Sequence, residues 1–285
     1  MAKWIAADLP DLTGRTILVT GAGSGIGLIT ARELARVGAR VVVGVRSVEK
    51  AKRAIAGMPG TLDVCHLDVA NMASVRAFAQ AWTGDLDVLV NNAGVMAIPA
   101  ARTADGFDVQ TATNYLGPFV LTNLLLPHVT DRVVSVTSQL HRQSKMNIDD
   151  LDWRTRTYHR MNAYNDSKLA LVLFSLELQR RLRTAGSRVR SILAHPGIAT
   201  TTLAAHSSAN AINRFTFLLN DPEGGALPTL YAATQDVPGN AYVGPDGLGS
   251  IRGYPTVRKP GKAGLDEAKA RHLWQATAAL TGAGQ

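Results

Sequence analysis

Cysteine and long hydrophobic runs are the scarcest features of this sequence. The single thiol, Cys65, cannot form an internal disulfide, and this predicts a reducing compartment. Because Cys65 lies in the apolar stretch "LDVCHLDV", we interpret it as a small core residue rather than a nucleophile. No apolar run is long enough to span a bilayer, and the start "MAKWIAADLP" lacks the pattern of a signal peptide. We therefore expect a cytoplasmic protein that binds no membrane.

Clustered charge is also lacking. The chain has 30 Lys+Arg against 22 Asp+Glu, a formal charge of +8, but its cations are scattered in short groups such as "RRLR". No basic stripe alternates with aromatic residues, as single-strand binders require, so we predict no nucleic-acid partner. A basic nucleic-acid-binding protein stays an alternative that a gel shift tests. No His, Cys, Asp and Glu have metal-ligand spacing, so we predict no metal site.

The chain also lacks internal repeats and linker-like stretches, which favours one domain over residues 1–285. Short β-branched runs alternate with longer helical patterns. The predicted strands are 16–20, 40–45, 63–68, 86–91, 132–138, 189–195 and 240–244. The predicted helices are 25–37, 48–56, 72–83, 106–128, 162–184, 223–235 and 265–281.

The near-continuous apolar strands are typical of a parallel sheet buried on both faces. The fold class predicted is therefore α/β, a Rossmann-type doubly wound parallel sheet of about seven strands with helices on both faces. Ligands of such sheets bind at the carboxyl ends of the strands.

A glycine-rich turn, "TGAGSGIG" at 20–27, follows the first strand and opens the first helix. Its spacing is Gly21-x-x-x-Gly25-x-Gly27, and Ile26 stands where a third glycine of the usual Gly-x-Gly-x-x-Gly pattern would fall. Glycine lets the backbone approach a phosphate closely, and a helix N-terminus offers free N–H groups. We predict a nucleotide cradle whose members are Gly21, Gly23, Ser24, Gly25, Ile26 and Gly27.

The second strand ends in "VGVRSVEK", where many dinucleotide sites carry an acidic residue for the ribose 2′-hydroxyl. An arginine there can receive a 2′-phosphate instead. Arg46 with Ser47 therefore favours NADP(H) over NAD(H). The alternative is that Arg46 only begins an exposed helix.

Tyr164 and Lys168 lie one helical turn apart in "NAYNDSKLAL" at 162–171. They could be exposed neighbours on one helix face. An ammonium close to a phenol also lowers the pKa of the phenol toward neutrality, which suits a group that exchanges protons with an alcohol or carbonyl. The spacing alone does not separate these two interpretations.

Seven motifs in order extend this pattern: "TGAGSGIG", "LDV" (67–69), "NNAG" (91–94), Asn114, Ser138, "YNDSK" (164–168) and "HPG" (195–197). With them the chain resembles the classical short-chain dehydrogenase/reductase (SDR) family along nearly its whole length, most closely the retinol-dehydrogenase-like branch. Two features depart from the family pattern. Ser138 and Tyr164 are 26 positions apart, more than in the smallest members, and Thr137 stands where a second serine is common.

The resemblance implies an NADP(H)-dependent oxidoreductase that interconverts an alcohol and a ketone or aldehyde, with Tyr164 as proton donor and acceptor. It implies that Lys168 binds the nicotinamide ribose and that Ser138 donates to the substrate oxygen. It also implies that Asn114 lies at a helix kink and holds a water in a relay to Lys168; the alternative is an Asn that only interrupts a helix. The further cofactor contacts it implies are Asp68, Val69, Asn92, Ala93, Gly94, Pro196, Gly197 and Ile198. A catalytically silent nucleotide-binding or scaffold protein of the same fold is the alternative.

The resemblance also implies a substrate lid at 198–219, and we expect Trp153 and Tyr158 to form the opposite wall. We interpret His195 as structural, and His141 and His159 as loop residues that lie at the surface or touch substrate. The two long helical patterns carry more apolar positions than one face need bury, namely Leu121, Leu124, Leu125, Leu171, Phe174 and Leu178. Since family members pair through these helices, a homodimer or homotetramer is expected.

Overall fold

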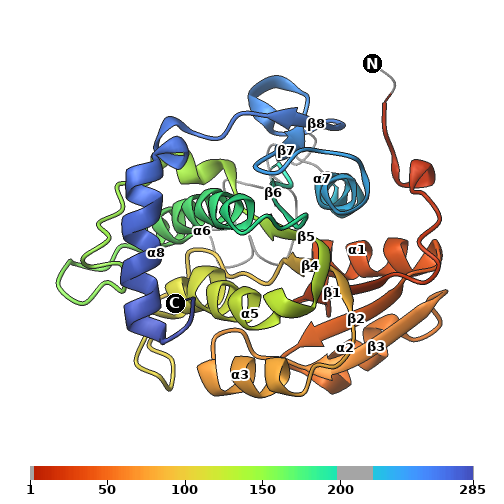
Figure 1. The fold of residues 1–285 in the computed structure, drawn as a ribbon, viewed down its shortest axis with the longest axis horizontal. Helices are drawn as coiled ribbons and strands as arrows, with labels where there is room; N and C mark the ends of the chain where they lie inside the picture. Colours follow the sequence, from red (N-terminus) through yellow and green to blue (C-terminus); the bar gives the residue numbers. More distant parts are fainter. Residues whose placement is uncertain (1–2, 198–220, 285) are drawn as a thin grey trace.

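Eight strands form one sheet in the order β3-β2-β1-β4-β5-β6-β7-β8 in this computed structural model, which describes residues 3–197 and 221–284 (Figure 1). All neighbouring strands are parallel except β7 and β8. Their bounds are β1 Thr16–Thr20, β2 Arg40–Val45, β3 Thr61–His66, β4 Leu86–Asn91, β5 Val129–Val136, β6 Arg190–Ala194, β7 Tyr242–Pro245 and β8 Pro255–Arg258. The doubly wound α/β fold is confirmed, with one strand more than expected.

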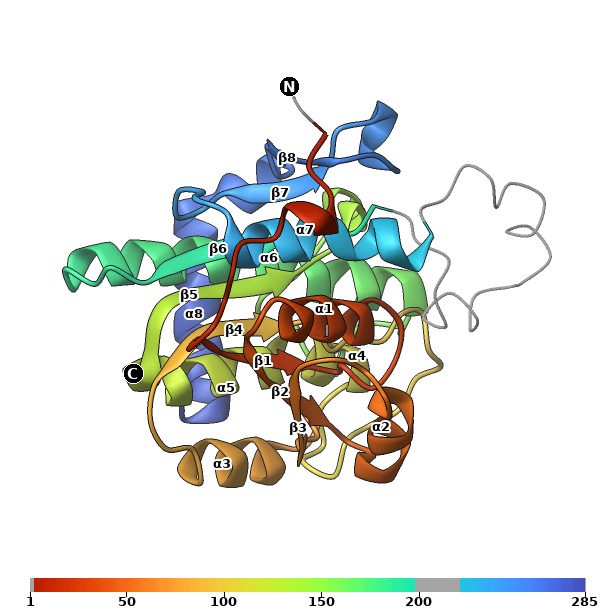
Figure 2. The same cartoon turned by 90° about the vertical axis from the view of Figure 1, so that its right-hand side faces the viewer.

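Helices cover both faces of this sheet (Figures 1 and 2). One apolar core includes residues of α1 (Gly25–Arg36), α2 (Val48–Ile55) and α7 (Pro222–Thr234). The other includes residues of α3 (Met72–Gln80), α5 (Gly117–Leu125), α6 (Arg160–Thr184) and α8 (Glu267–Thr281). Central strands such as β1 are apolar on both sides because each side meets one of these cores.

The segment predicted as one helix over 106–128 is interrupted. It consists of α4 (Val109–Thr111), a π-helical turn at Ala112–Leu116, α5, and a 3-10 turn at Leu126–His128. In the π turn the N–H of Gly117 bonds to the carbonyl of Ala112, five residues back. Such turns commonly occur at functional sites, and this one contains Asn114.

The C-terminal helix α8 lies against α6 (Figure 1). The Trp274 ring stacks on Phe174 at 5.6 Å between centroids and meets Phe119 edge-on at 5.0 Å. A hydrogen bond of 2.7 Å joins the hydroxyls of Tyr115 and Thr277. The apolar positions from which we expected an oligomer are fully buried inside this subunit, apart from the half-buried Leu124.

The strand that sequence reasoning missed, β8, is four residues long and pairs antiparallel at the sheet edge. The expected lid at 198–219, including Ile198, lies outside the described residues. In the part of the chain that the structure describes, no helix is long and apolar enough to cross a membrane.

Candidate functional site

A cavity of about 750 Å³ lies where strands β1 to β6 end, between the glycine turn and α6. Nearly all predicted site residues line it. They are Gly21, Gly23, Ser24, Gly25, Ile26, Gly27, Arg46, Ser47, Asp68, Val69, Asn92, Ala93, Gly94, Ser138, Tyr164, Lys168, Pro196 and Gly197. The residues that sequence reasoning missed include Lys50, Val95, Met96, Gln139 and Leu140.

The glycine turn is built by close packing and by backbone conformation. Gly21 and Gly25 have φ values of +69° and +56°, in the left-handed region that favours glycine. A Cβ on Gly21 would lie 2.8 Å from the Cα of Ala93, and one on Gly27 would lie 2.3 Å from Nδ2 of Asn92. Contact with the "NNAG" segment after β4 therefore accounts for Gly21 and Gly27, and the left-handed backbone accounts for Gly25.

Thr20 fixes the same contact through hydrogen bonds. Its hydroxyl accepts from the backbone N–H groups of Asn92 and Ala93, both at 3.0 Å, and its carbonyl accepts from the Asn92 side chain at 2.8 Å. The turn leads into α1, whose N-cap residue Ser24 makes no side-chain capping bond. The first N–H groups of α1 are therefore available to an anion, and the cradle fits a dinucleotide pyrophosphate.

Two cations lie at the rim of the cavity beyond β2. Arg46 and Lys50 are both exposed and line it together with Ser47. Within residues 3–197 and 221–284 neither cation has an ion pair, whereas the adjacent Lys52 is paired with Glu49. Lys50 lies in the first turn of α2, directly after the segment that holds Arg46 and Ser47, and that position is the signal by which the sequence could have identified it.

The carboxylate of Asp68 lies at the cofactor end of β3. Its Oδ1 accepts from the backbone N–H of Ala70 at 3.0 Å, and its own backbone N–H donates to the Ser74 hydroxyl at the same distance. These bonds fix the loop that places Asp68 and Val69 in the cavity.

Tyr164 and Lys168 extend from α6 into the cavity and are only 4% and 5% exposed. The interpretation of an exposed surface pair is therefore wrong. The Lys168 ammonium donates to the carbonyl of Val136 at 3.0 Å and lies 5.9 Å from the centre of the Tyr164 ring. Ser138, at the end of β5, is hydrogen-bonded to Tyr164.

Burial dominates the pKa values of both groups. It raises the pKa of Tyr164 to about 12, although the hydrogen bond with Ser138 acts in the opposite direction. It lowers the pKa of Lys168 to about 8. The sequence argument expected Lys168 to lower the pKa of Tyr164, but here the loss of hydration has the larger effect.

Asn114 is not among the residues that line the cavity, and within the described residues no hydrogen bond joins its side chain to Tyr164 or Lys168. Its Oδ1 accepts from the N–H of Val95 at 2.8 Å, and its Nδ2 donates to the Val95 carbonyl and to the Ser167 hydroxyl, both at 2.9 Å. The π-helical turn thus places an amide that ties the loop after β4 to α6. The water relay stays a prediction.

The expected wall of Trp153 and Tyr158 is not found. These two rings meet edge-on, with 5.8 Å between their centroids. The Tyr158 hydroxyl donates to the Ile98 carbonyl and accepts from the Gln110 side chain. Among the described residues neither ring lines the cavity, whose large apolar lining side chains include Met96 and Leu140. The rings were misassigned because they are held by loop contacts that the sequence does not reveal.

The three histidines differ in position. His159 is exposed and caps α6, with Nδ1 accepting from the N–H of Asn162 at 3.4 Å. His195 is buried, its Nδ1 accepts from the N–H of Gly197, and burial lowers its pKa to about 3, which agrees with a structural role. His141 is only 1% exposed, so the expectation of a surface histidine is wrong for this residue.

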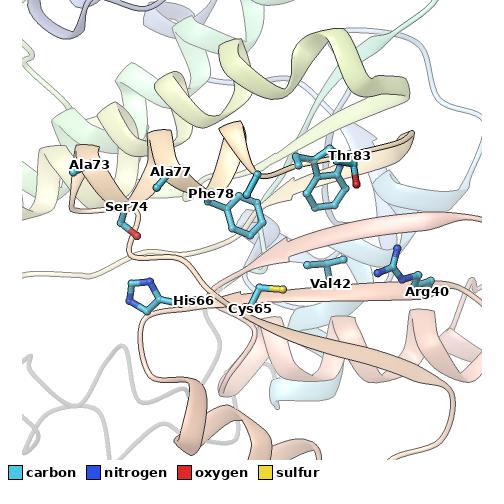
Figure 3. Close-up of a pocket in the computed structure, with 11 residues that line it drawn as sticks. Arg40, Val42, Cys65, His66, Ala73, Ser74, Ala77, Phe78 and Thr83 are labelled. Atoms are coloured by element: carbon cyan, nitrogen blue, oxygen red, sulfur yellow. The ribbon is translucent and has the colours of Figure 1, made fainter.

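A second cavity, of about 690 Å³, lies between α3 and the β2–β3 edge of the sheet, away from the glycine turn (Figure 3). Cys65 and Phe78 line it, with Arg40 and His66 at opposite ends. Burial raises the pKa of the Cys65 thiol, so the thiol stays protonated and unreactive at neutral pH. Among the described residues no three His, Cys, Asp or Glu side chains form a group that could hold a metal ion.

Comparison with known proteins gives a consistent result. The sequence model described as short chain dehydrogenase matches residues 15–211. The chain is 38% identical to human retinol dehydrogenase 13 (95% of this chain, 86% of that protein) and 39% identical to mouse polyprenol dehydrogenase (97% and 86%).

Solved structures agree. A crystal structure of an uncharacterised protein from Mycobacterium paratuberculosis has a TM-score of 0.88 and 45% identity, covering 99% of this chain and 98% of that one. The angucycline C-6 ketoreductase LanV with bound NADP has a TM-score of 0.64 and 26% identity, covering 82% and 94%. The residues matched by the short chain dehydrogenase model include the glycine turn and the Tyr164–Lys168 pair.

Proposed function

Because this chain belongs to the short-chain dehydrogenase family and is an NAD(P)-dependent enzyme acting on CH–OH donors, we propose that it uses NADP(H), with Tyr164 as proton donor and acceptor. One observation carries this proposal: Ser138, Tyr164 and Lys168 share a single cavity with the glycine turn and with Arg46. A catalytic group and a nucleotide cradle in one cavity are what hydride transfer between cofactor and substrate requires.

The proton chemistry follows from the environment of Tyr164. A pKa raised to about 12 keeps the phenol protonated at neutral pH, as a proton donor to a carbonyl oxygen must be. The bound nicotinamide supplies or accepts the hydride. Ser138 donates to the oxygen on which negative charge develops, and Lys168 stabilises the phenolate left after proton transfer.

The preference for NADP(H) is supported by Arg46 and Lys50 at the cavity rim. Two cations without ion pairs among the described residues suit a 2′-phosphate, and Ser47 adds a hydroxyl donor between them. No acidic residue follows β2 directly to accept from a ribose 2′-hydroxyl. The same charges would attract NADH less strongly.

A lipophilic alcohol or its carbonyl form is the proposed substrate class. Val95, Met96 and Leu140 give the cavity that holds Ser138 part of its apolar lining. The relatives named as retinol and polyprenol dehydrogenases support the same class.

The test is oxidation of NADPH and of NADH, measured against ketones and aldehydes from short aliphatic chains to all-trans-retinal. We expect faster turnover with NADPH and with the longer apolar substrates. Tyr164→Phe should lower kcat at least ~100-fold while NADPH binding, followed by fluorescence, is retained. Turnover that survives in this variant would remove Tyr164 from its role, and nucleotide binding without turnover in the wild type would favour the silent nucleotide-binding alternative.

Several properties stay predictions: a single domain with a lid at 198–219, a cytoplasmic location, and no binding to nucleic acids or membranes. A homodimer or homotetramer also stays a prediction. It now depends on family resemblance, because the apolar positions that suggested it are packed inside the subunit. Light scattering tests it, and a mass near 30 kDa would contradict it.

A further inference from the structure

His141 lies in the 3-10 turn Gln139–Gln143 that directly follows Ser138. Its Nδ1 is 2.6 Å from the carbonyl oxygen of Ser138, and its Nε2 is 2.8 Å from the backbone nitrogen of Gly261, 120 residues further along the chain. Both ring nitrogens are therefore hydrogen-bonded, one to an acceptor and the other to a donor.

The two partners determine the tautomer. A carbonyl oxygen can only accept, so the proton must be on Nδ1, while a backbone N–H can only donate, so Nε2 must present its lone pair. A protonated imidazole would direct a second N–H against the N–H of Gly261. Burial lowers the pKa of His141, the hydrogen bond to Ser138 acts against this, and Arg142 adds to the lowering, so the ring is neutral at pH 7.

The His141 ring is also packed against other side chains. Tyr242 of β7 meets it edge-on at 5.6 Å between ring centroids and stacks on His195 at 5.0 Å. A Cβ on Gly261 would lie only 3.1 Å from Nε2 of His141. The adjacent Arg142 also donates to the carbonyl of Lys259. Two successive residues of the 3-10 turn, His141 and Arg142, are therefore hydrogen-bonded to the segment around Gly261.

The Ser138 carbonyl accepts from His141 twice, from Nδ1–H and from the backbone N–H at 3.1 Å. The orientation of a carbonyl sets the ψ angle of its residue and, with it, the direction of the Cα–Cβ bond. The Ser138 hydroxyl also accepts from the N–H of Leu140 at 3.2 Å, and it lies against Tyr164. A rotation of this peptide would displace the hydroxyl from the Tyr164 phenol.

We infer that His141 is a positioning residue: as its neutral Nδ1–H tautomer it holds the Ser138 carbonyl and joins the segment at Gly261 to the serine that faces substrate. This inference rests on the proposed function, in which Ser138 donates to the substrate oxygen. It assigns separate effects to the two ring nitrogens. The Nδ1 contact maintains kcat by orienting Ser138, and the Nε2 contact with Gly261 raises thermal stability.

Three substitutions separate these effects. An Asn side chain can place an amide N–H near the position of Nδ1 but does not reach Gly261, so His141→Asn keeps the contact to Ser138. A Gln side chain can place its oxygen near the position of Nε2, so His141→Gln keeps the contact to Gly261. His141→Ala keeps neither.

We expect kcat to fall ~10- to 100-fold in His141→Gln and His141→Ala, because small misplacements of a reacting group cost that much. His141→Asn should recover most of the loss. Thermal stability should follow a different order, with His141→Gln above His141→Asn and His141→Ala. NADPH affinity, measured by fluorescence, should be the same in all three. A merely structural histidine would make kcat follow stability, and that outcome would overturn the inference.

Two further measurements distinguish a failure of the inference about His141 from a failure of the proposed function. The ¹⁵N chemical shifts of the wild-type His141 ring should show a protonated Nδ1 and an unprotonated Nε2 at pH 7, and the reverse would overturn the inference whatever the activity. Ser138→Ala should lower kcat ~100-fold or more. If it does not, Ser138 loses its proposed role and the inference falls with it; if it does while His141→Ala keeps full kcat, only the inference fails.

Discussion

The ammonium of Lys168 lies 5.9 Å from the centre of the Tyr164 ring and donates to the Val136 carbonyl, on the strand side of α6. Both side chains are buried, and burial moves their pKa values in opposite directions, upward for the phenol and downward for the ammonium. The protein therefore holds a charge in the cavity at a cost to its own stability. That cost is measurable.

Lys168→Met should stabilise the nucleotide-free protein at pH 7. Burial lowers the pKa of Lys168 from 10.5 to about 8, so the unfolded chain binds its proton more tightly than the folded one. Below pH 8 this difference lowers the unfolding free energy of the wild type by roughly 2–4 kcal/mol. As pH rises from about 8 to 10.5, the wild type recovers this free energy relative to the variant.

Urea unfolding of both proteins at pH 7 and pH 10 measures the effect. The variant should be more stable at pH 7 and closer to the wild type at pH 10, and it should have lost turnover. Equal stability at pH 7 would show that the ammonium is better solvated than its burial indicates.

Arg46→Ala and Lys50→Ala should each raise KM for NADPH ~10-fold, since a charge-assisted contact to phosphate is worth about 1.5–3 kcal/mol. KM for NADH should change little, because NADH lacks the 2′-phosphate. Arg53→Ala is the matched control: this arginine is exposed on helix α2, as Lys50 is, but it is not among the residues that line the cavity. A similar loss in the control would indicate general electrostatic attraction rather than a phosphate contact.

The strands were the most predictable part of the fold. The bounds of β1, β2 and β4 are those expected from the sequence, because each is a short β-branched run buried on both sides. The strand β8 (Pro255–Arg258) was missed because it is short and half exposed, so its sequence has no strong apolar pattern. The resemblance implied a kink at Asn114, but not its π-helical form, because the side-chain contact of Asn114 to Val95 is a tertiary one.

The candidate site was predictable where motifs follow strand ends. The glycine turn after β1 and Ser138 after β5 line one cavity, as expected at the carboxyl ends of a doubly wound sheet, and Tyr164 and Lys168 reach it from α6. Leu140 and His141 were not assigned correctly, although they directly follow Ser138. His141 is hydrogen-bonded to Gly261, and no local pattern relates residues 120 positions apart.

Gly27→Ala should destabilise the protein by about 1–3 kcal/mol, as overpacking of a filled site does. The added Cβ would meet Nδ2 of Asn92 at 2.3 Å and the Gly21 carbonyl at 2.9 Å. Gly23→Ala is the matched control for stability, since its Cβ would come no closer than 3.4 Å, to Cγ1 of Val45. Thermal unfolding of the two variants without nucleotide measures the difference, and equal melting temperatures would contradict the packing argument.

Trp274→Ala should lower the free energy of unfolding by about 3–5 kcal/mol, the usual effect of truncating a buried aromatic side chain. The ring is 3% exposed, stacks on Phe174, and lies under the guanidinium of Arg181 at 4.3 Å. Its Nε1 also donates to the carbonyl of Gly284 at 2.8 Å.

Trp274→Phe separates these contributions, because it keeps an aromatic ring against Phe174 and loses the Nε1 hydrogen bond, worth about 1 kcal/mol. The alanine variant uncovers apolar side chains of α5 and α6, so light scattering should show self-association that the phenylalanine variant does not. If Trp274→Ala unfolds like the wild type and its mass is unchanged, α8 is not what covers this face of α6.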